Sequence, residues 1–336
     1  MIELTALMSV YNGEKFLEES IKSVLNQSFK DFKLIIINDG SDDATKEVID
    51  KFNDPRISVY SFENNQGVGN ALNFGLSMVD TKYFVKVDAD DINHPARFHK
   101  QLNFLKENPE ISVVGSLVKF FPDHKTIEGT NRYQYLKSFY EMNSNKIVSS
   151  EELAEKLFWY CCITHASIMC HTDVIKTINY PEYLCGEDYY VFYNLNKKGY
   201  KFHKMNEVLV DIRVTNNSTT VRQNDYFFDI LLDIKKDEIE NILSHANSNI
   251  YIWGIGSLGN KVIDSNLIDV KKIKGIIDSS KDKWGTTIKG LKVYSPDVLS
   301  LRNNKIIVAS TIGKFEIINN LKKMGYKHLE DFIVIW

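Results

Sequence analysis

The sequence lacks three features that would assign it to a special class of protein: a long apolar run, a concentrated basic region and a cysteine framework. No apolar run approaches the roughly 18 residues that span a bilayer, so we expect at most peripheral membrane contact. The 41 Lys and Arg residues are scattered apart from a modest cluster in DVKKIKG, and the net charge is −3. Nucleic acids are bound by concentrated basic faces, so we expect no nucleic-acid partner.

Cysteine is scarce, and its spacing is uninformative. The chain has 4 cysteines and no C-x-x-C pair, namely Cys161, Cys162, Cys170 and Cys185. Without a secretory leader, the thiols are expected to be reduced and the protein cytoplasmic, either free or at the inner face of the cell membrane. Zinc ligation is the alternative, although an adjacent Cys-Cys pair fits the usual ligand spacing poorly.

What the sequence does have is the size of two domains. It contains 336 residues, 43% of them apolar and 25% charged, which is the balance of an ordinary globular protein. The patterns described below predict a larger α/β domain over residues 1–224, a helical connector over 225–248 and a smaller α/β domain over 249–336.

Strand and helix patterns alternate through the first hundred residues. LTALMSVY, KLIIIND, ISVYSF and YFVKV predict strands, and apolar residues at helical spacing between them predict helices, with Asn12 and Ser41 placed as caps. Apolar strands alternating with amphipathic helices indicate a mainly parallel sheet covered on both faces. The polar stretch from Pro122 to Ser150 predicts mobile loops.

Polar loops follow the predicted strands, in SVYNGE, NDGSDD, NNQGVGN and DADD. Ligands of open α/β sheets bind beyond the carboxyl ends of the strands, so these loops should converge on one crevice. The last loop places Asp88, Asp90 and Asp91 directly after an apolar strand. Because like charges raise one another's pKa, this cluster needs compensation, and we expect a positive group beside it.

These motifs resemble those of family 2 glycosyltransferases, an inverting group with the GT-A fold. The likeness covers roughly residues 1–220 and runs through SVYNGEKFLEESIKSVLNQSFKDFKLIIINDGSDDAT, NNQGVGNALNFGL, VDADDINHPARFHKQ, THASIM and GEDYYVFYNL. The resemblance implies a GT-A nucleotide-sugar-binding fold, a nucleotide-sugar donor, a divalent metal and single-displacement transfer to a hydroxyl.

The resemblance also implies roles for individual residues. Asp90 and Asp88 would bind Mn²⁺ or Mg²⁺. Asp188 would be the catalytic base with Glu187 beside it, and helix-start amides are expected to keep Asp188 ionised. The implied donor-binding residues are Val10, Tyr11, Glu14, Asp39, Gly67, Asn73, Asp88, Ala89, His165 and Arg213.

Structural alternatives remain open for these residues. The acidic cluster could be a turn whose Asp91 caps the helix near Pro95, and Asp39 could cap a turn. His165 could be a buried structural histidine, and Arg213 could pair with a surface carboxylate. The chain also has Thr215 where the family often has histidine. If that histidine contacts the metal or the diphosphate, this chain lacks the contact.

The predicted second domain begins with WGIGSLG, in which Gly254, Gly256 and Gly259 lie between a strand and a helix, and Asp278 ends the next strand. This is the context of a dinucleotide fingerprint. It resembles the small Rossmann-like, nucleotide-binding-like domain fused to sugar acetyltransferases and C-methyltransferases. The binding partner of this domain remains open: it could be a nucleotide, a sugar-nucleotide or a partner chain in a homo-oligomer, or the domain could bind no ligand.

The sequence therefore predicts a metal-dependent hexosyltransferase. It would move a sugar from a nucleoside-diphosphate donor, of the UDP type, to a hydroxyl of a glycan or lipid-linked acceptor in surface polysaccharide assembly. A non-catalytic sugar-nucleotide-binding protein is the alternative. A nucleotidyltransferase is disfavoured, because SVYNGEKF is not the glycine- and arginine-rich loop that this class needs after its first strand.

Overall fold

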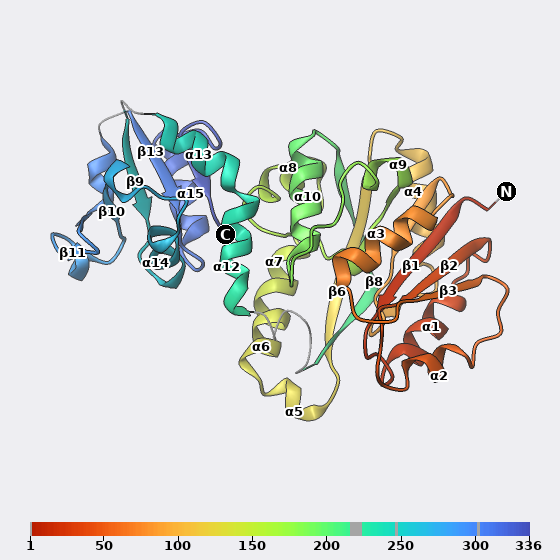
Figure 1. Ribbon diagram of the computed structural model, residues 1–336. Helices are drawn as coiled ribbons and strands as arrows, with labels where there is room; N and C mark the ends of the chain where they lie inside the picture. Colours follow the sequence, from red (N-terminus) through yellow and green to blue (C-terminus); the bar gives the residue numbers. More distant parts are fainter. Residues whose placement is uncertain (1, 216–223, 246–247, 301–302) are drawn as a thin grey trace. The chain divides into compact units, whose positions relative to one another are not determined.

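The chain folds into two compact units, Met1–Gln223 and Asn224–Trp336, each with its own sheet. No helix in the described ranges has the length and apolar character needed to cross a membrane. The computed structural model (Figure 1) describes residues 2–215, 224–245, 248–300 and 303–336.

The described part of the first unit contains an eight-stranded sheet in the order β3-β2-β1-β4-β7-β6-β8-β5. Strands β1 to β4 are mutually parallel, β7 is antiparallel to both of its neighbours, and β6 is parallel to β8. The prediction of a mainly parallel sheet is confirmed. The strands are β1 (Leu4–Val10), β2 (Phe32–Asn38), β3 (Ile57–Ser61), β4 (Tyr83–Lys86), β5 (Ile92–Asn93), β6 (Val113–Pro122), β7 (Met169–His171) and β8 (Phe202–Val214).

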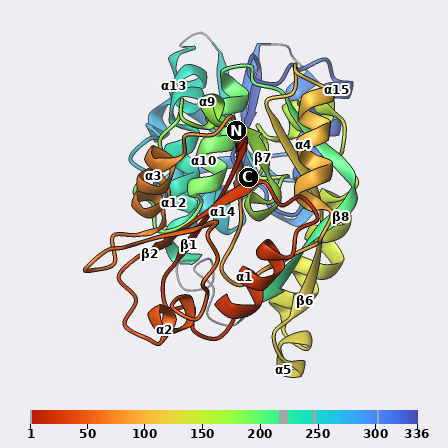
Figure 2. The same cartoon turned by 90° about the vertical axis from the view of Figure 1, so that its right-hand side faces the viewer.

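Helices cover both faces of this sheet. Figure 2 shows α1 and α4 on one side of β1 and α3 on the other. A Cβ added at Gly75 of α3 would lie 2.4 Å from the Leu7 side chain, so α3 packs closely on β1. The longer helices are α1 (Leu17–Leu25), α3 (Val68–Met78), α4 (Arg97–Glu107) and α10 (Glu187–Lys197), and the shorter ones are α2 (Thr45–Ile49), α8 (Ser150–Lys156) and α9 (Thr172–Ile175).

The central strand β1 is apolar on both faces because helices pack on both. Met8 and Val10 join the core shared with α1 and α4, whereas Leu7 faces α3. Strand β3 lies at the edge of the sheet, and most of its residues are exposed, which is usual for an edge strand.

Two predicted helix caps are wrong. Helix α1 begins after Phe16 rather than at Asn12, and α2 begins after Ala44 rather than at Ser41. Asn12 has a φ of 54° and belongs to the preceding loop. These polar side chains bond to the neighbouring loop instead of to a helix start.

The stretch from Pro122 to Ser150, expected to form mobile loops, is instead largely helical. Its apolar residues Ile127 and Tyr133 are buried in a small cluster against β6 and β8. Few anchors therefore suffice to fix a mostly polar segment. The elements are α5 (Lys125–Glu128), α6 (Asn131–Gln134), the π-helical segment Tyr135–Glu141 and α7 (Met142–Ser144).

The described part of the second unit has a six-stranded sheet in the order β11-β12-β10-β9-β13-β14. Strands β12, β10, β9, β13 and β14 are parallel, and β11 is antiparallel to β12. Helices α12 (Asn224–Ile234) and α13 (Lys236–Ser244), expected as a separate connector, group with this unit. The other elements are β9 (Asn249–Trp253), α14 (Ser257–Asp264), β10 (Ile273–Ile277), β11 (Thr287–Ile288), β12 (Leu291–Tyr294), β13 (Asn304–Val308), α15 (Lys314–Lys323) and β14 (Phe332–Val334).

Candidate active site

The loops after β1 and β2 are hydrogen-bonded to each other at the carboxyl end of the first sheet. The Asn12 amide nitrogen donates to Ser41 Oγ at 3.0 Å, and Asn12 Nδ2 donates to Asp42 Oδ1 at 2.6 Å. The Gly13 amide nitrogen donates to Thr45 Oγ1 at 2.8 Å. The two loops therefore form one rigid rim.

Glu14 and the residues beside it complete this rim. The Glu14 amide nitrogen donates to Asp43 at 3.1 Å, and the Ala44 amide nitrogen donates to Glu14 Oε2 at 3.0 Å. Tyr11 is 44% exposed, while Val10 is buried and its carbonyl accepts the Asp39 amide. Tyr11 and Glu14 are both exposed, and Glu14 in addition holds the loop through its two hydrogen bonds.

Asp39, after β2, organises the loop before α3. Its carboxylate accepts the backbone amides of Gln66 and Gly67 at 2.8 and 3.0 Å and the Asn65 side-chain amide at 3.1 Å. Burial raises the pKa of Asp39, although these hydrogen bonds oppose the shift. Gly67 has a φ of 91°, which requires glycine there. Asp39 thus has the turn-capping contacts that the sequence left open, and base recognition by it stays a prediction.

Asn73 is engaged elsewhere. Its amide exchanges two hydrogen bonds with the backbone of Tyr180, both at 2.9 Å, so it anchors the loop before α10. The Tyr180 hydroxyl in turn lies 2.8 Å from His165 Nε2. His165 is 8% exposed, and burial lowers its pKa to about 3, so it is neutral at pH 7.

The acidic turn after β4 has positive charge from the chain itself. Lys86 is only 2% exposed, and its ammonium pairs with the carboxylate of Asp88. Sequence reasoning expected a positive group at this turn but missed Lys86, although it stands two residues before Asp88. Ala89 packs partly buried against the core, and the Ser20 hydroxyl donates to the Asp88 carbonyl at 2.6 Å.

Asp91 does not cap α4, which begins at Arg97 after Ala96. Its carboxylate, 3% exposed, instead accepts the backbone amide of Arg213 at 2.9 Å. The prediction that Asp91 caps the helix is therefore wrong. Its local sequence resembles a helix start, but the partner lies on distant strand β8.

The Arg213 side chain braces the same turn. Its Nε donates to the Asp90 carbonyl at 2.9 Å, and its guanidinium pairs with Glu19. The rings of Phe16 and Phe121 lie 4.4 and 4.6 Å from the guanidinium carbon. The surface-carboxylate alternative for Arg213 matches these contacts.

The three carboxyl groups of the turn differ in acidity. Burial opposes ionisation of Asp88, but the charge of Lys86 holds its pKa below the ordinary value. Burial and the Asp88 charge raise the pKa of Asp90 to about 6. Burial and both neighbouring carboxylates raise the pKa of Asp91 well above its ordinary value.

Arg97 is a second buried cation that sequence reasoning missed. It is fully buried, and burial lowers its pKa to about 9. Its guanidinium bonds to the side chains of Asn93 and Gln101 and to the carbonyls of Lys86 and Ile168. The spacing of Arg97 and Gln101 on one helical turn was a signal that could have indicated this pairing.

The predicted base lies at the start of α10, after Gly186, which has a φ of 76°. Asp188 Oδ1 accepts the Tyr189 amide at 2.6 Å. Burial nevertheless raises the pKa of Asp188, which corrects the expectation that helix-start amides dominate. Burial and the Asp188 charge raise the pKa of Glu187 to about 8.

Cys161 approaches Asp188, a contact that residue spacing does not indicate. Its Sγ lies 3.9 Å from Asp188 Oδ2, and its carbonyl accepts the Tyr140 hydroxyl at 3.0 Å. Burial raises the pKa of Cys161 well above its ordinary value, so it remains a thiol. All 4 cysteines are described, buried and free.

The acidic turn and the start of α10 share one electrostatic environment. The negative charge of Asp88 raises the pKa of both Glu187 and Asp188. Asp88 is therefore near enough to the start of α10 for its charge to act there, although the two segments lie far apart in the chain.

The carboxylate oxygens of the acidic turn are ligands of the kind that hard divalent cations prefer. Within the described ranges, no group of three or more His, Cys, Asp or Glu side chains is arranged to hold a metal. Mg²⁺ commonly takes only one or two protein carboxylates, with phosphate oxygens and waters as its other ligands. Asp88 and Asp90 would be those carboxylates.

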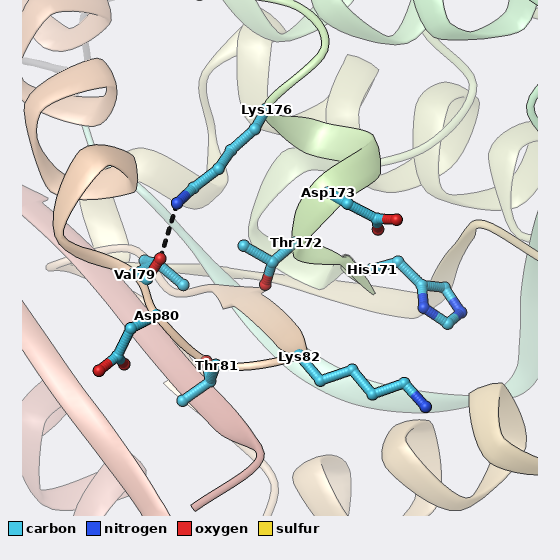
Figure 3. Close-up of a pocket in the computed structure, with 8 residues that line it drawn as sticks. All are labelled: Val79, Asp80, Thr81, Lys82, His171, Thr172, Asp173 and Lys176. Atoms are coloured by element: carbon cyan, nitrogen blue, oxygen red, sulfur yellow. Dashed lines mark hydrogen bonds between the residues drawn. The ribbon is translucent and has the colours of Figure 1, made fainter.

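A separate cavity of about 440 Å³ opens at the amino end of β4 (Figure 3). Its charges are mixed, since Asp80 pairs with Lys33 at 2.7 Å and Lys176 donates to the Val79 carbonyl at 2.7 Å. None of the predicted site residues lines it. The lining residues are Val79, Asp80, Thr81, Lys82, His171, Thr172, Asp173 and Lys176.

The glycine-rich turn of the second unit has tight backbone packing. Gly254 has a φ of 109°, and a Cβ added at Gly259 would lie 2.1 Å from the Gly254 carbonyl oxygen. Asp278 accepts the Ser280 amide at 2.9 Å and pairs with Lys283 at 3.1 Å. These contacts account for Gly254, Gly259 and Asp278 without a ligand but not for Gly256, and nucleotide binding by this unit stays a prediction.

Two family models match the chain. The model described as Glycosyl transferase family 2 matches residues 5–170. The model described as C2185-like, N-terminal matches residues 246–330, within the second unit.

Curated relatives are glycosyltransferases. An uncharacterized glycosyltransferase of Haemophilus influenzae is 27% identical over 329 residues, which cover 94% of this chain and 98% of the relative. A second one from that species is 36% identical over 184 residues, covering 52% and 72%. The O-antigen biosynthesis glycosyltransferase WbnJ of Escherichia coli is 26% identical over 251 residues, covering 72% and 92%.

Solved structures share the fold. TarS of S. aureus in complex with UDP-GlcNAc has a TM-score of 0.55 at 19% identity, over 71% of this chain and 67% of that one. The mannosyltransferase PcManGT of Pyrobaculum calidifontis, in complex with GDP-Man and Mn²⁺, has a TM-score of 0.50 at 15% identity, over 78% and 67%.

Proposed function

This chain belongs to glycosyl transferase family 2, and we propose that it transfers a hexose-type sugar, with inversion, from a nucleoside-diphosphate donor to an acceptor hydroxyl. The donor is a UDP-sugar, and the acceptor is a glycan or a lipid-linked sugar of a surface polysaccharide. The reaction takes place in the cytoplasm or at the inner face of the cell membrane and depends on Mn²⁺ or Mg²⁺.

The observation that carries this proposal is the placement of two carboxylate pairs, Asp88 with Asp90 in the turn after β4 and Glu187 with Asp188 at the start of α10, within the first unit. An inverting transfer needs charge neutralisation at the leaving diphosphate and a base for the acceptor. The acidic turn after β4 suits the first task, and the start of α10 suits the second.

In the displacement, the acceptor oxygen bonds to the anomeric carbon while the bond from that carbon to the diphosphate oxygen breaks. The electron pair of the broken bond leaves with the diphosphate. Asp188 takes the acceptor proton, and its raised pKa makes it a stronger base. Glu187, with a pKa of about 8, is mostly protonated at neutral pH, so its carboxyl group has a proton with which to hydrogen-bond the substrate. Asp88 and Asp90 would hold the divalent cation, which would supply positive charge to neutralise the departing diphosphate.

The relatives support the substrate class. TarS was solved with UDP-GlcNAc, and WbnJ is named for O-antigen biosynthesis. PcManGT was solved with GDP-Man and Mn²⁺, so a donor screen has to include guanine nucleotides.

The test begins with a thermal-shift screen of UDP- and GDP-sugars, each with and without Mn²⁺, because a ligand of the folded state raises the melting temperature. Release of the nucleoside diphosphate is then measured with the stabilising donor. Asp188→Asn should lower turnover by about 10³-fold or more and keep the donor-induced stabilisation. Asp173→Asn, a change at the start of α9, is the matched control. Normal turnover of Asp188→Asn would contradict the assigned base.

A further inference from the structure

Lys86 lies at the carboxyl end of β4, in the interior of the first unit. It is 2% exposed, and its backbone amide donates to the Ile168 carbonyl at 3.2 Å, so the strand is fixed at this point. Removing an ammonium from water is unfavourable unless a counter-charge and hydrogen bonds replace the water. The partners of this ammonium therefore matter.

The Lys86 ammonium has one charged partner among the described residues. It donates to the Val87 carbonyl at 2.9 Å and to Asp88 Oδ1, and Asp88 is the acid with which it forms an ion pair. The other side of Asp88 remains open, with 36% of the side chain exposed. The carboxylate is thus shared between a buried cation and the solvent.

The neighbouring cations do not replace Lys86. The bonds of Arg97 go to amide oxygens and backbone carbonyls. Arg213 pairs with Glu19 and bonds to the Asp90 carbonyl. In the described part of the chain, Lys86 is therefore the cation in direct contact with the Asp88 carboxylate.

We propose that Lys86 is a built-in counter-ion of Asp88, which is displaced when a divalent cation takes that carboxylate. The inference rests on the metal role of Asp88 and Asp90 in the proposed function. With no cation bound, the ammonium compensates the clustered carboxylates. When a cation binds, two positive charges compete for one carboxylate, and their repulsion weakens the affinity for the metal.

This competition couples the metal to the donor. The bare protein offers the cation few ligands and a repelling ammonium, so the cation binds weakly alone. Diphosphate oxygens add ligands and negative charge, and the cation is then held firmly. The protein thereby takes up metal together with the nucleotide.

The test is Mn²⁺ binding to the full-length protein without nucleotide, measured from the electron paramagnetic resonance signal of free Mn²⁺. Lys86→Met should bind Mn²⁺ about tenfold more tightly than wild type, because one repelling charge is gone. It should also gain more in melting temperature from Mn²⁺.

Lys204→Met is the matched control. Lys204 is also buried, at 1% exposed, but its ammonium bonds to the neutral acceptors Ser144 and Cys162. Its loss should lower the melting temperature and leave the Kd for Mn²⁺ unchanged. This control separates loss of a buried lysine from loss of the competing charge.

Unchanged or weaker Mn²⁺ binding by Lys86→Met would overturn the inference. Asp90→Asn separates this result from failure of the proposed function. If wild type binds Mn²⁺ and Asp90→Asn does not, the metal site stands and only the role of Lys86 is lost. If wild type and Asp90→Asn bind Mn²⁺ equally, the assigned metal site is wrong as well.

A measurement on wild type covers the case in which Lys86→Met does not fold. In protein labelled with ¹⁵N-lysine, an ammonium buried in an ion pair exchanges its protons slowly enough to give a signal. Saturating Mg²⁺ together with the nucleoside diphosphate of the donor that stabilises the protein should shift or remove one such signal. An unperturbed spectrum while that nucleotide and Mg²⁺ are bound would overturn the inference.

Discussion

The turns that follow β4 and β9 leave parallel strands at the same kind of sheet edge, but they differ in chemistry. The turn after β4 carries Asp88, Asp90 and Asp91 and is surrounded by buried cations. The turn after β9 carries Gly254, whose carbonyl oxygen lies so close to Gly259 that a Cβ there would be 2.1 Å from it. One turn holds charge in place, and the other allows the chain to pack closely.

This difference shows how far a fold can indicate a function. The carboxyl ends of parallel strands are where α/β proteins bind ligands, and both turns satisfy that rule. Only the first turn also has side chains suited to a reaction, and function depends on such side chains rather than on the fold. Substitutions at the two turns and at buried ionisable groups of the two units test this difference.

The largest loss of turnover should come from replacing an aspartate that follows a strand of the first sheet. Asp90→Asn should lower donor turnover by about 10³-fold or more, because the carboxylate that would hold the cation is lost. Asp278→Asn, the corresponding change after β10, should leave turnover within about twofold. Initial rates with saturating Mn²⁺ measure both variants. Equal losses would mean that the second unit takes part in the chemistry.

The stability of the second unit should depend on the size of the side chain at the glycine-rich turn rather than on its charge. A Cβ at Gly259 would lie 2.1 Å from the Gly254 carbonyl oxygen, so Gly259→Val should destabilise the second unit by about 3 kcal/mol. A Cβ at Gly256 meets nothing within 4 Å, so Gly256→Ala is the control and should change stability by less than about 0.5 kcal/mol. Calorimetric unfolding measures both. Similar melting by the two variants would contradict the packing described for this turn.

One buried ionisable group in each unit should make the free energy of unfolding depend on pH, and the two dependences should have opposite signs. Burial raises the pKa of Glu187 to about 8, above its ordinary 4.5. Its contribution to the free energy of unfolding is therefore fully present below pH 4.5 and is lost as the pH rises to 8. Burial lowers the pKa of Lys235 to about 7, below its ordinary 10.5. Its contribution to the free energy of unfolding therefore grows as the pH rises from 7 towards 10.5.

Two variants check these signs by melting temperature between pH 5 and 9.5. Relative to wild type, Glu187→Gln should gain about 3–4 kcal/mol more stability at pH 8.5 than at pH 5, and Lys235→Met about as much more at pH 6 than at pH 9.5. The controls are the exposed residues Glu182 and Lys236, changed to Gln and Met. Parallel pH curves for each variant and wild type would refute the assignment.

Much of the fold could be predicted from apolar periodicity. That pattern reports which face of an element is buried, so it indicated the buried strands β1 and β2 and the helices between them. It indicated little for Pro122 to Ser150, where a few buried residues fix a mostly polar segment. Sequence patterns could not foresee this, because the burial of Ile127 and Tyr133 depends on distant strands.

The site was predictable in its location and less so in its contacts. Loops at strand ends and charged residues at helix starts are local signals, and they led to Asp88 and Asp188. Asn73 and Asp91 have partners about a hundred residues away, at Tyr180 and Arg213, and no local pattern encodes such pairs. The acidity of Asp188 depends on burial, which the sequence alone does not give.

The four buried thiols make the protein convenient for spectroscopy. Maleimide dyes and nitroxide spin labels react with accessible thiolates, and burial protects the native cysteines from them. A single cysteine introduced at an exposed position would then be the preferred site of reaction, with no need to remove the native ones. Probes attached in this way could follow the loops around the acidic turn while nucleotide sugars and Mn²⁺ are added.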